Sequence, residues 1–399
     1  MEKSWLTVGG QSYLLKKMRL LYLCDADSGG IAEYAIRQFY ALRDAGADVT
    51  FLCRPTFDLQ RMETPGVVAD LPAAPTRHPS SLQRFIRRVC DARSVSLIAA
   101  DVAAKGGYDA LLIACYAEYL SPFWAQILKN AARKGLLIGS IAHDPVRDFV
   151  LGPLWWHRLS IRHAYSFVSH VFVHDMTTID FGGPKPEHIK VHIIPHGPYE
   201  VTQPNQERRV IRSRFGFTDA DTVFLSFGQI RDGKNLDRIL RAMPSLPENV
   251  KLLVAGSGGA ASQRPPEAYV QMAQELGVAA RCAWDFRYIP NAETGDFLAA
   301  ADYLLLTYSA RFRSASGVLN TAVASLKSVL ASSGDGPLKT AVESYHLGIF
   351  VPPDDDAAIL DGALRLITSP PEPEWERYMR ENSWQENAGR ILQAFTTNH

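Results

Sequence analysis

The chain alternates between short apolar runs and longer segments in which apolar residues recur every three or four positions. Runs of four to seven apolar residues are typical of buried strands, and the spaced segments are typical of amphipathic helices. Strands separated by helices indicate parallel crossover connections and hence an α/β fold. The predicted strands cover residues 18–24, 49–53, 110–115, 136–142, 171–174, 191–194, 222–227, 251–255, 283–286, 303–306 and 328–331. The predicted helices include residues 31–45, 235–243, 268–276, 354–366 and 384–395.

The pattern starts afresh after a polar segment at residues 203–209, which indicates a domain boundary. We therefore predict two Rossmann-like, doubly wound domains that face one another across a cleft, one from residues 18–200 and one from 207–379. The final helix, within 380–399, is expected to complete the first domain. Residues 1–17 are expected to be a loose extension.

Glycine-rich turns follow the first strand of each predicted domain. Gly29 and Gly30 follow the first, and a turn that begins at Gly228 and contains Arg231 and Lys234 follows the second. Glycine lets a backbone approach a ligand closely, and the two cations suit a pyrophosphate. An exposed basic turn in the second domain and a purely structural glycine turn in the first remain alternatives, because the GxGxxG pattern is absent.

A second phosphate site is predicted within residues 302–332, which have the order strand, basic loop, helix, strand. Arg313 lies in the loop, Ser316 is placed to cap the helix, and Gly317 opens it. The free N–H groups of a helix start favour an anion. Many α/β units of this kind bind nothing, so a purely structural unit is the alternative.

His143 follows the strand at 136–142, where open α/β sheets place ligands. A structural histidine is the alternative. No DxD motif stands at the end of a strand, so we predict no metal site.

An aromatic and basic segment at residues 152–173 includes Trp155 and Trp156. A half-buried helix explains it, and a peripheral contact with a membrane surface or a lipid acceptor is the sharper alternative. The basic segment at 84–93 is interpreted as the solvated face of a helix.

Composition narrows the class of protein. The 399 residues are 47% hydrophobic, and 42 lysines and arginines balance 42 acidic residues, so no global charge points to nucleic acid. The five cysteines are scattered without a CxxC motif, which favours a reduced, cytoplasmic protein. No apolar run has the roughly 18 residues of a membrane span, and we see no signal peptide.

Several motifs, in order, resemble retaining glycosyltransferases of the GT-B fold, family four (glycosyl transferases group 1). The resemblance runs from residue 18 to 395. It is carried by SGGIAEYA, IPHG, FGQIRDGKN, LLVAGSG, ADYLLLTY, SGVLNTAVASLKSVLAS and SWQENA. It implies a nucleotide-sugar donor, a phosphate-binding Lys234, a phosphate-binding helix start at Gly317 and Val318, and a histidine near the donor sugar at His143.

The residue pattern and the resemblance together define a candidate site. The predicted catalytic residues are His143, Lys234 and Arg231. The predicted donor-phosphate residues are Lys234, Arg231, Arg313, Ser316, Gly317, Val318, Gly29 and Gly30. The predicted base and sugar residues are Gly228, Gln229, Arg287, Tyr288, Ile289 and Ser314.

The chain departs from the family at three positions. The family usually has two glutamates eight positions apart that contact the sugar and the ribose, where this sequence has Ser314 and Ala322. The arginine that usually follows the glycine at position 228 is Gln229 here, which leaves Arg231 as a substitute. Recognition of the sugar and the ribose is therefore expected to differ.

The resemblance implies a metal-independent transferase that moves a sugar from a nucleotide-diphosphate sugar to a glycan or lipid-linked acceptor. It implies retention of the anomeric configuration and a place in surface polysaccharide or glycolipid assembly at the inner face of the membrane. No cofactor is expected beyond the donor substrate. The alternatives are a non-catalytic transferase-like partner subunit and a GT-B nucleotide-sugar epimerase or phosphorylase.

Overall fold

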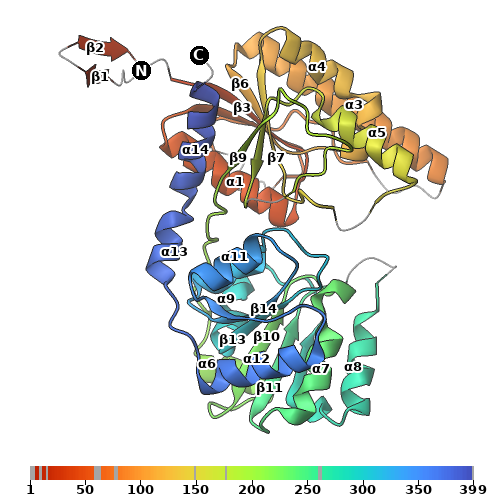
Figure 1. Ribbon diagram of the computed structural model, residues 1–399, viewed down its shortest axis with the longest axis vertical. Helices are drawn as coiled ribbons and strands as arrows, with labels where there is room; N and C mark the ends of the chain where they lie inside the picture. The colour runs from red at the N-terminus through yellow and green to blue at the C-terminus, as the bar shows by residue number, and fades with distance from the viewer. Residues whose placement is uncertain are drawn as a thin grey trace.

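The computed structural model contains two α/β units, each built on a fully parallel sheet (Figure 1). It describes residues 5–8, 11–14, 17–57, 64–75, 80–147, 150–175, 178–258 and 263–397. The first sheet has the strand order β5-β4-β3-β6-β7-β8-β9, and the second has the order β12-β11-β10-β13-β14-β15. This confirms the predicted fold class of two Rossmann-like units.

The strands of the first unit are β3 (Arg19–Cys24), β4 (Asp48–Leu52), β5 (Val67–Val68), β6 (Ala110–Cys115), β7 (Leu137–Ile141), β8 (His170–Val173) and β9 (Lys190–Ile193). Those of the second are β10 (Thr222–Phe227), β11 (Val250–Ala255), β12 (Cys282–Asp285), β13 (Tyr303–Thr307), β14 (Val329–Ser332) and β15 (Gly348–Phe350). Before the first sheet, β1 (Trp5–Val8) and β2 (Gln11–Leu14) pair antiparallel within the segment predicted as an extension.

The helices from the first half are α1 (Gly29–Asp44), α3 (Ser81–Gly106), α4 (Ala125–Arg133) and α5 (Leu154–Tyr165). Those from the second half are α6 (Arg208–Arg214), α7 (Leu236–Ala242), α8 (Pro266–Glu275), α9 (Asn291–Ala300), α10 (Gly317–Ala324), α11 (Pro337–Ser344), α12 (Asp356–Thr368), α13 (Trp375–Glu381) and α14 (Trp384–Thr396). Four short 3-10 helices are η1 (Glu118–Phe123), η2 (Asp232–Lys234), η3 (Met243–Ser245) and η4 (Ala279–Arg281).

Both faces of each sheet are covered by helices. On β3, Leu20 and Tyr22 pack with α1 and α14, whereas Leu21 and Leu23 pack with α3, α4 and α5 on the opposite face. Successive residues of a strand point to opposite faces, so a strand buried on both sides must be apolar throughout. This explains why the first unit's central strands were readable as continuous apolar runs.

The end of the chain returns to the first unit (Figure 1). Helix α14 packs along α1, and Asn387 in α14 donates hydrogen bonds from Nδ2 to the Tyr34 hydroxyl, at 2.9 Å, and to the Pro195 carbonyl, at 2.7 Å. The side chain of Gln38 also donates to Asn387 Oδ1, at 2.7 Å. These buried bonds join α14 to the first unit although about 350 residues separate the partners in sequence.

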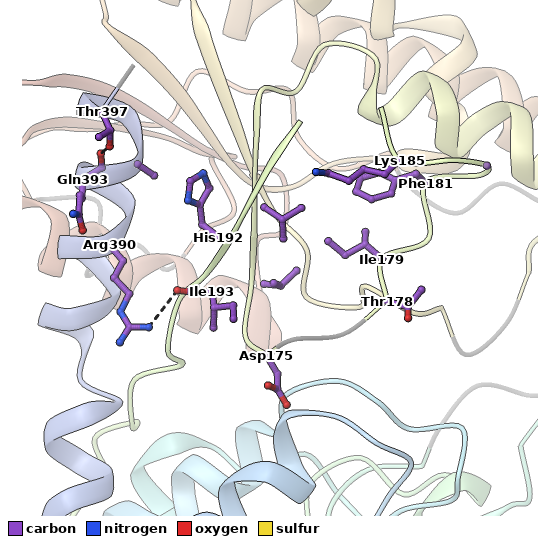
Figure 2. A pocket seen from close by; sticks show the side chains of 14 residues that line it. Asp175, Thr178, Ile179, Phe181, Lys185, His192, Ile193, Arg390, Gln393 and Thr397 are labelled. Atoms are coloured by element: carbon purple, nitrogen blue, oxygen red, sulfur yellow. Dashed lines mark hydrogen bonds between the residues drawn. The ribbon is translucent and has the colours of Figure 1, made fainter. Parts of the chain in front are cut away.

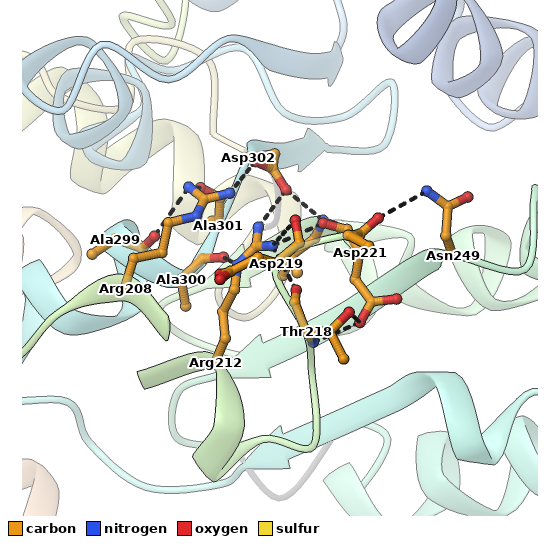
Figure 3. A network of polar contacts seen from close by, with 12 residues as sticks. Arg208, Arg212, Thr218, Asp219, Asp221, Asn249, Ala299, Ala300, Ala301 and Asp302 are labelled. Carbon is orange, nitrogen blue, oxygen red and sulfur yellow. Dashed lines mark hydrogen bonds and ion pairs between the residues drawn. The ribbon is translucent and has the colours of Figure 1, made fainter. Parts of the chain in front are cut away.

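A buried ion-pair network ties α6 to the second sheet (Figure 3). The Arg212 side chain is fully buried; it donates to Asp302 Oδ2 at 2.6 Å and to the carbonyls of Ala300, Thr218 and Asp221 at 2.8 to 2.9 Å. The backbone N–H of Val223 also donates to Asp302, at 2.8 Å. The network therefore joins α6 to the starts of β10 and β13.

Several elements were absent from the sequence prediction or weakly indicated: α3, α4, α6, α9, α11, α13, β1, β2, β5, β12 and β15. In α3, exposed apolar residues at the start and many small residues later reduce the contrast between its faces, which weakens a periodic pattern. Strand β15 has only three residues, too few for periodicity to be read. Among the described residues, every helix is too short or too polar to span a bilayer.

Candidate functional site

A cavity of about 690 Å³ lies between the two units, at the carboxyl edges of their sheets. The first unit and the linker line it with Asp27, Ser28, Gly29, Gly30, Ala32, Glu33, Thr56, Phe57, Tyr199, Glu200, Val201 and Thr202. The second unit lines it with Phe227, Gly228, Gln229, Gly256, Ser257, Tyr288, Ile289, Asn291, Thr294, Gly317, Val318 and Thr321. Parallel sheets place ligands at this edge, so the cavity has the position expected of a substrate site.

The Lys234 ammonium lies under the glycine turn that follows β10. It donates a hydrogen bond to the Phe227 carbonyl, and a Cβ on Gly228 would lie 3.7 Å from Nζ and 3.9 Å from Val318 Cγ2. The turn and the start of α10 therefore meet at this lysine. Gly228 has a φ of 85°, a conformation that favours glycine.

Burial, and to a smaller extent the positive charge of the neighbouring Arg231, lower the pKa of Lys234 from its usual 10.5 to about 7. A buried cation without an anionic partner is costly, so the lysine loses its proton more readily. A bound anion reverses this effect by stabilising the charged form. The position thus suits a phosphate.

The start of α10 faces the same cavity. Ser316 Oγ accepts a hydrogen bond from the Leu319 N–H at 3.3 Å, so Ser316 is the N-cap that the sequence predicted. Gly317 and Val318 then present the first turn of the helix to the cavity, with Gly317 beside the Tyr199 ring. A helix start carries partial positive charge and favours an anion.

Gly256, after β11, shapes the floor of the cavity. It has a φ of 152°, and a Cβ at this position would lie 1.9 Å from the Gly228 carbonyl oxygen. The N–H of Gly228 donates to the Ala255 carbonyl at 2.9 Å, which holds the two turns together. Only a glycine fits at 256 while the turn at Gly228 keeps this position.

Eight of the predicted site residues line the cavity: Gly29, Gly30, Gly228, Gln229, Tyr288, Ile289, Gly317 and Val318. The other predicted residues are not among those that line it: His143, Arg231, Lys234, Arg287, Arg313, Ser314 and Ser316. Arg231 stacks over the rings of Tyr308 and Phe312, at 5.9 and 5.6 Å. Arg287 pairs with Glu293 and Asp285, and Arg313 is exposed.

Three histidines surround Tyr34 at the carboxyl ends of β7, β8 and β9. The ring centres of His143, His174 and His196 lie 4.8, 5.4 and 4.9 Å from that of Tyr34. Burial lowers the pKa of His143 to about 3 and that of His174 to about 4, so both are neutral at pH 7. Their Nε2 atoms are buried and make no hydrogen bond within the described chain. Within the residues that the structure describes, no group of acidic, histidine or cysteine residues is arranged to hold a metal ion.

Two hydrogen bonds join the units beside α10. Ser314 Oγ donates to Asp144 Oδ1 at 2.6 Å, and the Asn320 amide bonds Nδ1 of His196 at 2.8 Å. The Tyr378 hydroxyl donates to Asn320 Oδ1 at 3.1 Å. The sequence analysis missed Asp144 and Asn320, because their partners are 170 and 124 residues away and no local pattern marks them.

A larger hollow, of about 940 Å³, lies between the edge strand β9 and α14 (Figure 2). Val191 and Ile193 line it, and Arg390 Nη1 donates to the Ile193 carbonyl at 3.3 Å. It has none of the predicted phosphate-site residues. The cavity between the units is therefore the candidate substrate site.

Comparison with known proteins finds similarity to glycosyltransferases. The family model for glycosyl transferases group 1 matches residues 207–386. A D-inositol 3-phosphate glycosyltransferase of Mycobacterium marinum is 25% identical over 203 residues, a match that covers 49% of this chain and 42% of that protein. The chain thus matches less than half the length of that relative.

Solved structures match almost the whole chain. Anabaena Alr3699/HepE in complex with UDP and glucose has a TM-score of 0.64 and 16% identity, over 95% of this chain and 96% of that one. A UDP-N-acetylglucosamine 2-epimerase has a TM-score of 0.56 and 13% identity, over 96% and 97%. At such identities the likeness establishes the fold. Residues 207–386 thus match the model of the glycosyl transferases group 1 family, and the two units together have the GT-B fold of the matched structures.

Proposed function

We propose that the protein transfers a sugar from a nucleotide-diphosphate sugar to a glycan or lipid-linked acceptor, with retention of the anomeric configuration. The second unit, residues 207–379, holds the donor in this proposal. The first unit, residues 18–200 with the helix in 380–399, faces the acceptor. The observation that carries the proposal is that the turn at Gly228 and the start of α10 line one cavity, with the Lys234 ammonium directly beside that turn.

The chemistry follows from charge. Breaking the sugar–phosphate bond leaves negative charge on the nucleoside diphosphate. Lys234 and the first turn of α10 stabilise that charge as it develops, and Arg231 adds to the positive potential from its place over Tyr308 and Phe312. Gly29 and Gly30 allow the first unit to approach the same diphosphate.

Neighbouring residues receive roles in the same scheme. We assign His143, whose ring is buried and neutral, to the side of the donor sugar. The backbone at Tyr288 and Ile289 holds the base. Ser314 takes the sugar side of the cavity, and Arg313 flanks the phosphates in this proposal.

We also propose where the enzyme works. A lipid-linked acceptor in surface polysaccharide or glycolipid assembly places the protein in the cytoplasm, at the inner face of the membrane. The exposed Trp155 on α5 supports a peripheral contact of this kind, because 64% of its surface is open to solvent.

A thermal-shift experiment tests donor binding. UDP, GDP and dTDP are each added to the protein, and we expect at least one to raise Tm because a ligand that binds the folded state stabilises it. Lys234→Ala should abolish the rise. Incubation with UDP-, GDP- and dTDP-sugars should then produce slow donor hydrolysis, followed by mass spectrometry.

Arg365→Ala provides a matched control for the loss of a cation, since Arg365 is an exposed residue on α12, outside the residues that line the cavity. It should keep the full rise in Tm. If no nucleotide raises the Tm of the unmodified protein or of Arg365→Ala, the proposed donor site is excluded.

A non-catalytic partner subunit is the second candidate, favoured by Ser314 and Ala322 at the positions of the family's two glutamates. It predicts nucleotide binding without turnover of any donor sugar. An epimerase, which shares the fold, predicts a change in the free nucleotide sugar without an acceptor. Mass spectrometry and chromatography of the sugar products separate the three activities.

A further inference from the structure

The first unit has an exposed surface of apolar and arginine side chains at the N-terminal end of α3 and along α5. We call it the α3–α5 surface. Its apolar members are Leu82, Phe85, Ile86, Phe123, Leu154 and Trp155. Its basic members are Arg84, Arg88, Arg158 and Arg162, all exposed.

The apolar members are far more exposed than side chains that pack in a core. Leu82 is 65% exposed, Ile86 50%, Leu154 54% and Trp155 64%. Single exposed apolar residues are ordinary, but a cluster of them marks a surface that another phase or molecule covers.

Ring contacts join the two helices into one surface. Phe85 of α3 lies 5.7 Å from Phe123 of η1, and Phe123 lies 5.9 Å from Trp156 of α5, between ring centres. Trp156 in turn contacts Trp155, at 5.8 Å. Arg93 adds a hydrogen bond from Nη1 to the Phe123 carbonyl, at 2.6 Å. The exposed residues of α3 and α5 are therefore held in a fixed arrangement.

The charge of this surface differs from that of the whole chain, whose formal net charge is zero. Residues 81–93 and 150–163 contain six arginines and one acidic residue, Asp91. Asp91 is paired with Arg54, at 2.8 Å, beneath the helix. The surface is thus strongly positive, which suits an anionic partner.

Helical spacing mixes the two kinds of side chain. On α5, Leu154, Arg158 and Arg162 recur every four residues and so share a face, and Trp155 lies beside them. Leucine and tryptophan beside arginine suit the boundary between lipid headgroups and acyl chains, because arginine stems lie along apolar surface while their charges reach phosphate.

Topology places this surface next to the cavity. Helix α5 follows β7 through the loop that carries His143, and helix starts in a parallel α/β unit lie at the carboxyl edge of the sheet. Figure 1 shows the start of α5 on the side of the first unit that faces the second. A lipid held at this surface therefore lies near the mouth of the substrate cavity.

We propose that the α3–α5 surface docks on an anionic lipid bilayer, with Leu82, Ile86, Leu154 and Trp155 in the headgroup region and the arginines on lipid phosphates. The proposal rests on the proposed function, since docking there brings a lipid-linked acceptor to the cavity. It assigns the membrane contact to two helices, of which α3 carries the larger basic cluster.

Vesicle co-sedimentation of the full chain tests the proposal. We expect binding to phosphatidylcholine vesicles that contain about one third phosphatidylglycerol, weaker binding to pure phosphatidylcholine, and a decrease as salt rises. The triple variant Leu82→Gln, Ile86→Gln, Trp155→Gln should lose roughly tenfold or more in affinity. Arg84→Gln with Arg88→Gln should lose affinity for the anionic vesicles alone.

Matched controls come from helices other than α3 and α5. Val210→Gln, an exposed apolar residue on α6, and Arg365→Gln with Arg380→Gln, two exposed arginines, should bind vesicles as the unmodified protein does. Equal binding by the triple variant and the unmodified protein would overturn the proposal, as would a lack of preference for anionic vesicles or association with a second copy in place of lipid.

The rise in Tm with nucleotide separates this proposal from the proposed function. The surface variants should keep the nucleotide response and lose the vesicles, and Lys234→Ala should do the reverse. A triple variant that loses the nucleotide response as well would indicate damage to the fold, in which case the arginine pair, whose side chains are exposed, decides the matter.

Discussion

Lys234 is a buried lysine whose pKa lies far below that of an exposed lysine. Its side chain lies between the Phe227 carbonyl and the start of α10, and burial holds its pKa at about 7. An ordinary surface lysine keeps its charge far above neutral pH. The protein therefore holds a cation that is only partly charged until an anion arrives.

This predicts that nucleoside diphosphate binding takes up protons at pH 8. The free side chain, with a pKa of about 7, is then mostly neutral, and the bound diphosphate raises the pKa and draws in a proton. Calorimetry in buffers with different ionisation enthalpies measures the uptake. It should approach one proton at pH 8 and decline toward pH 6, where Lys234 already carries its proton.

Lys234→Met tests the assignment, since it removes the titrating group and retains a side chain of similar length. Any residual binding by this variant should be free of proton uptake at pH 8. The same uptake in wild type and variant would assign the proton to another group.

At the scale of elements, α6 is held to the second sheet by Arg212 (Figure 3). One guanidinium satisfies the Asp302 carboxylate and the carbonyls that end α9 and precede β10. A buried charge with a complete set of partners is costly to break from one side, because the remaining groups lose their donor. The network thus fixes the helix on which the second unit begins.

Arg212→Met should lower the free energy of unfolding by about 3 to 5 kcal/mol, because it leaves Asp302 and three carbonyls without this donor. Chemical denaturation followed by circular dichroism measures the loss. Arg208→Met is the control: Arg208 also pairs with Asp302, but its side chain is 38% exposed, so the cost should be about 1 kcal/mol. Equal losses of unfolding free energy in the two variants would show that burial of the arginine does not determine the cost of its removal.

At the scale of the whole molecule, the two units meet through Asn320 and Ser314, both at or next to the start of α10, where we propose that the donor phosphate binds. The Asn320 side chain, on α10, forms hydrogen bonds with His196 of the first unit and with Tyr378 of α13. One residue of α10 therefore contacts both the first unit and the helix through which the chain returns to it. Burial holds the pKa of His196 well below its usual value, which keeps the ring neutral and able to accept this bond.

Ser314→Ala combined with Asn320→Ala should open the arrangement of the two units. Loss of the two hydrogen bonds, at roughly 1 kcal/mol for each, should weaken nucleotide affinity by about thirtyfold. Small-angle scattering should show a larger radius of gyration, with an unchanged circular dichroism spectrum. Thr340→Ala, which removes a more exposed contact between the units at Asp175, serves as the control and should change affinity less.

Much of the architecture could be predicted from residues 18–53 and 222–255, where strand, glycine turn, helix and strand follow one another. Each central strand is buried on both faces and is therefore mostly apolar, and a short loop directly follows it. Gly29, Gly228 and Gly317 could be predicted in the same way, since they stand at strand ends or a helix start. The exposed beginning of α3 has no such contrast, and its helix was only weakly indicated.

The sequence alone determined the two α/β units, the glycine turns and the capped helix start, because these depend on residues close together in the chain. Tertiary structure alone decided which of them meet. Ser314 with Asp144 and Asn320 with His196 are joined only when the two units pack, and Phe85 with Phe123 only when the first unit folds. The low pKa of Lys234 belongs to the same class, because burial is a property of the folded chain and not of the residue.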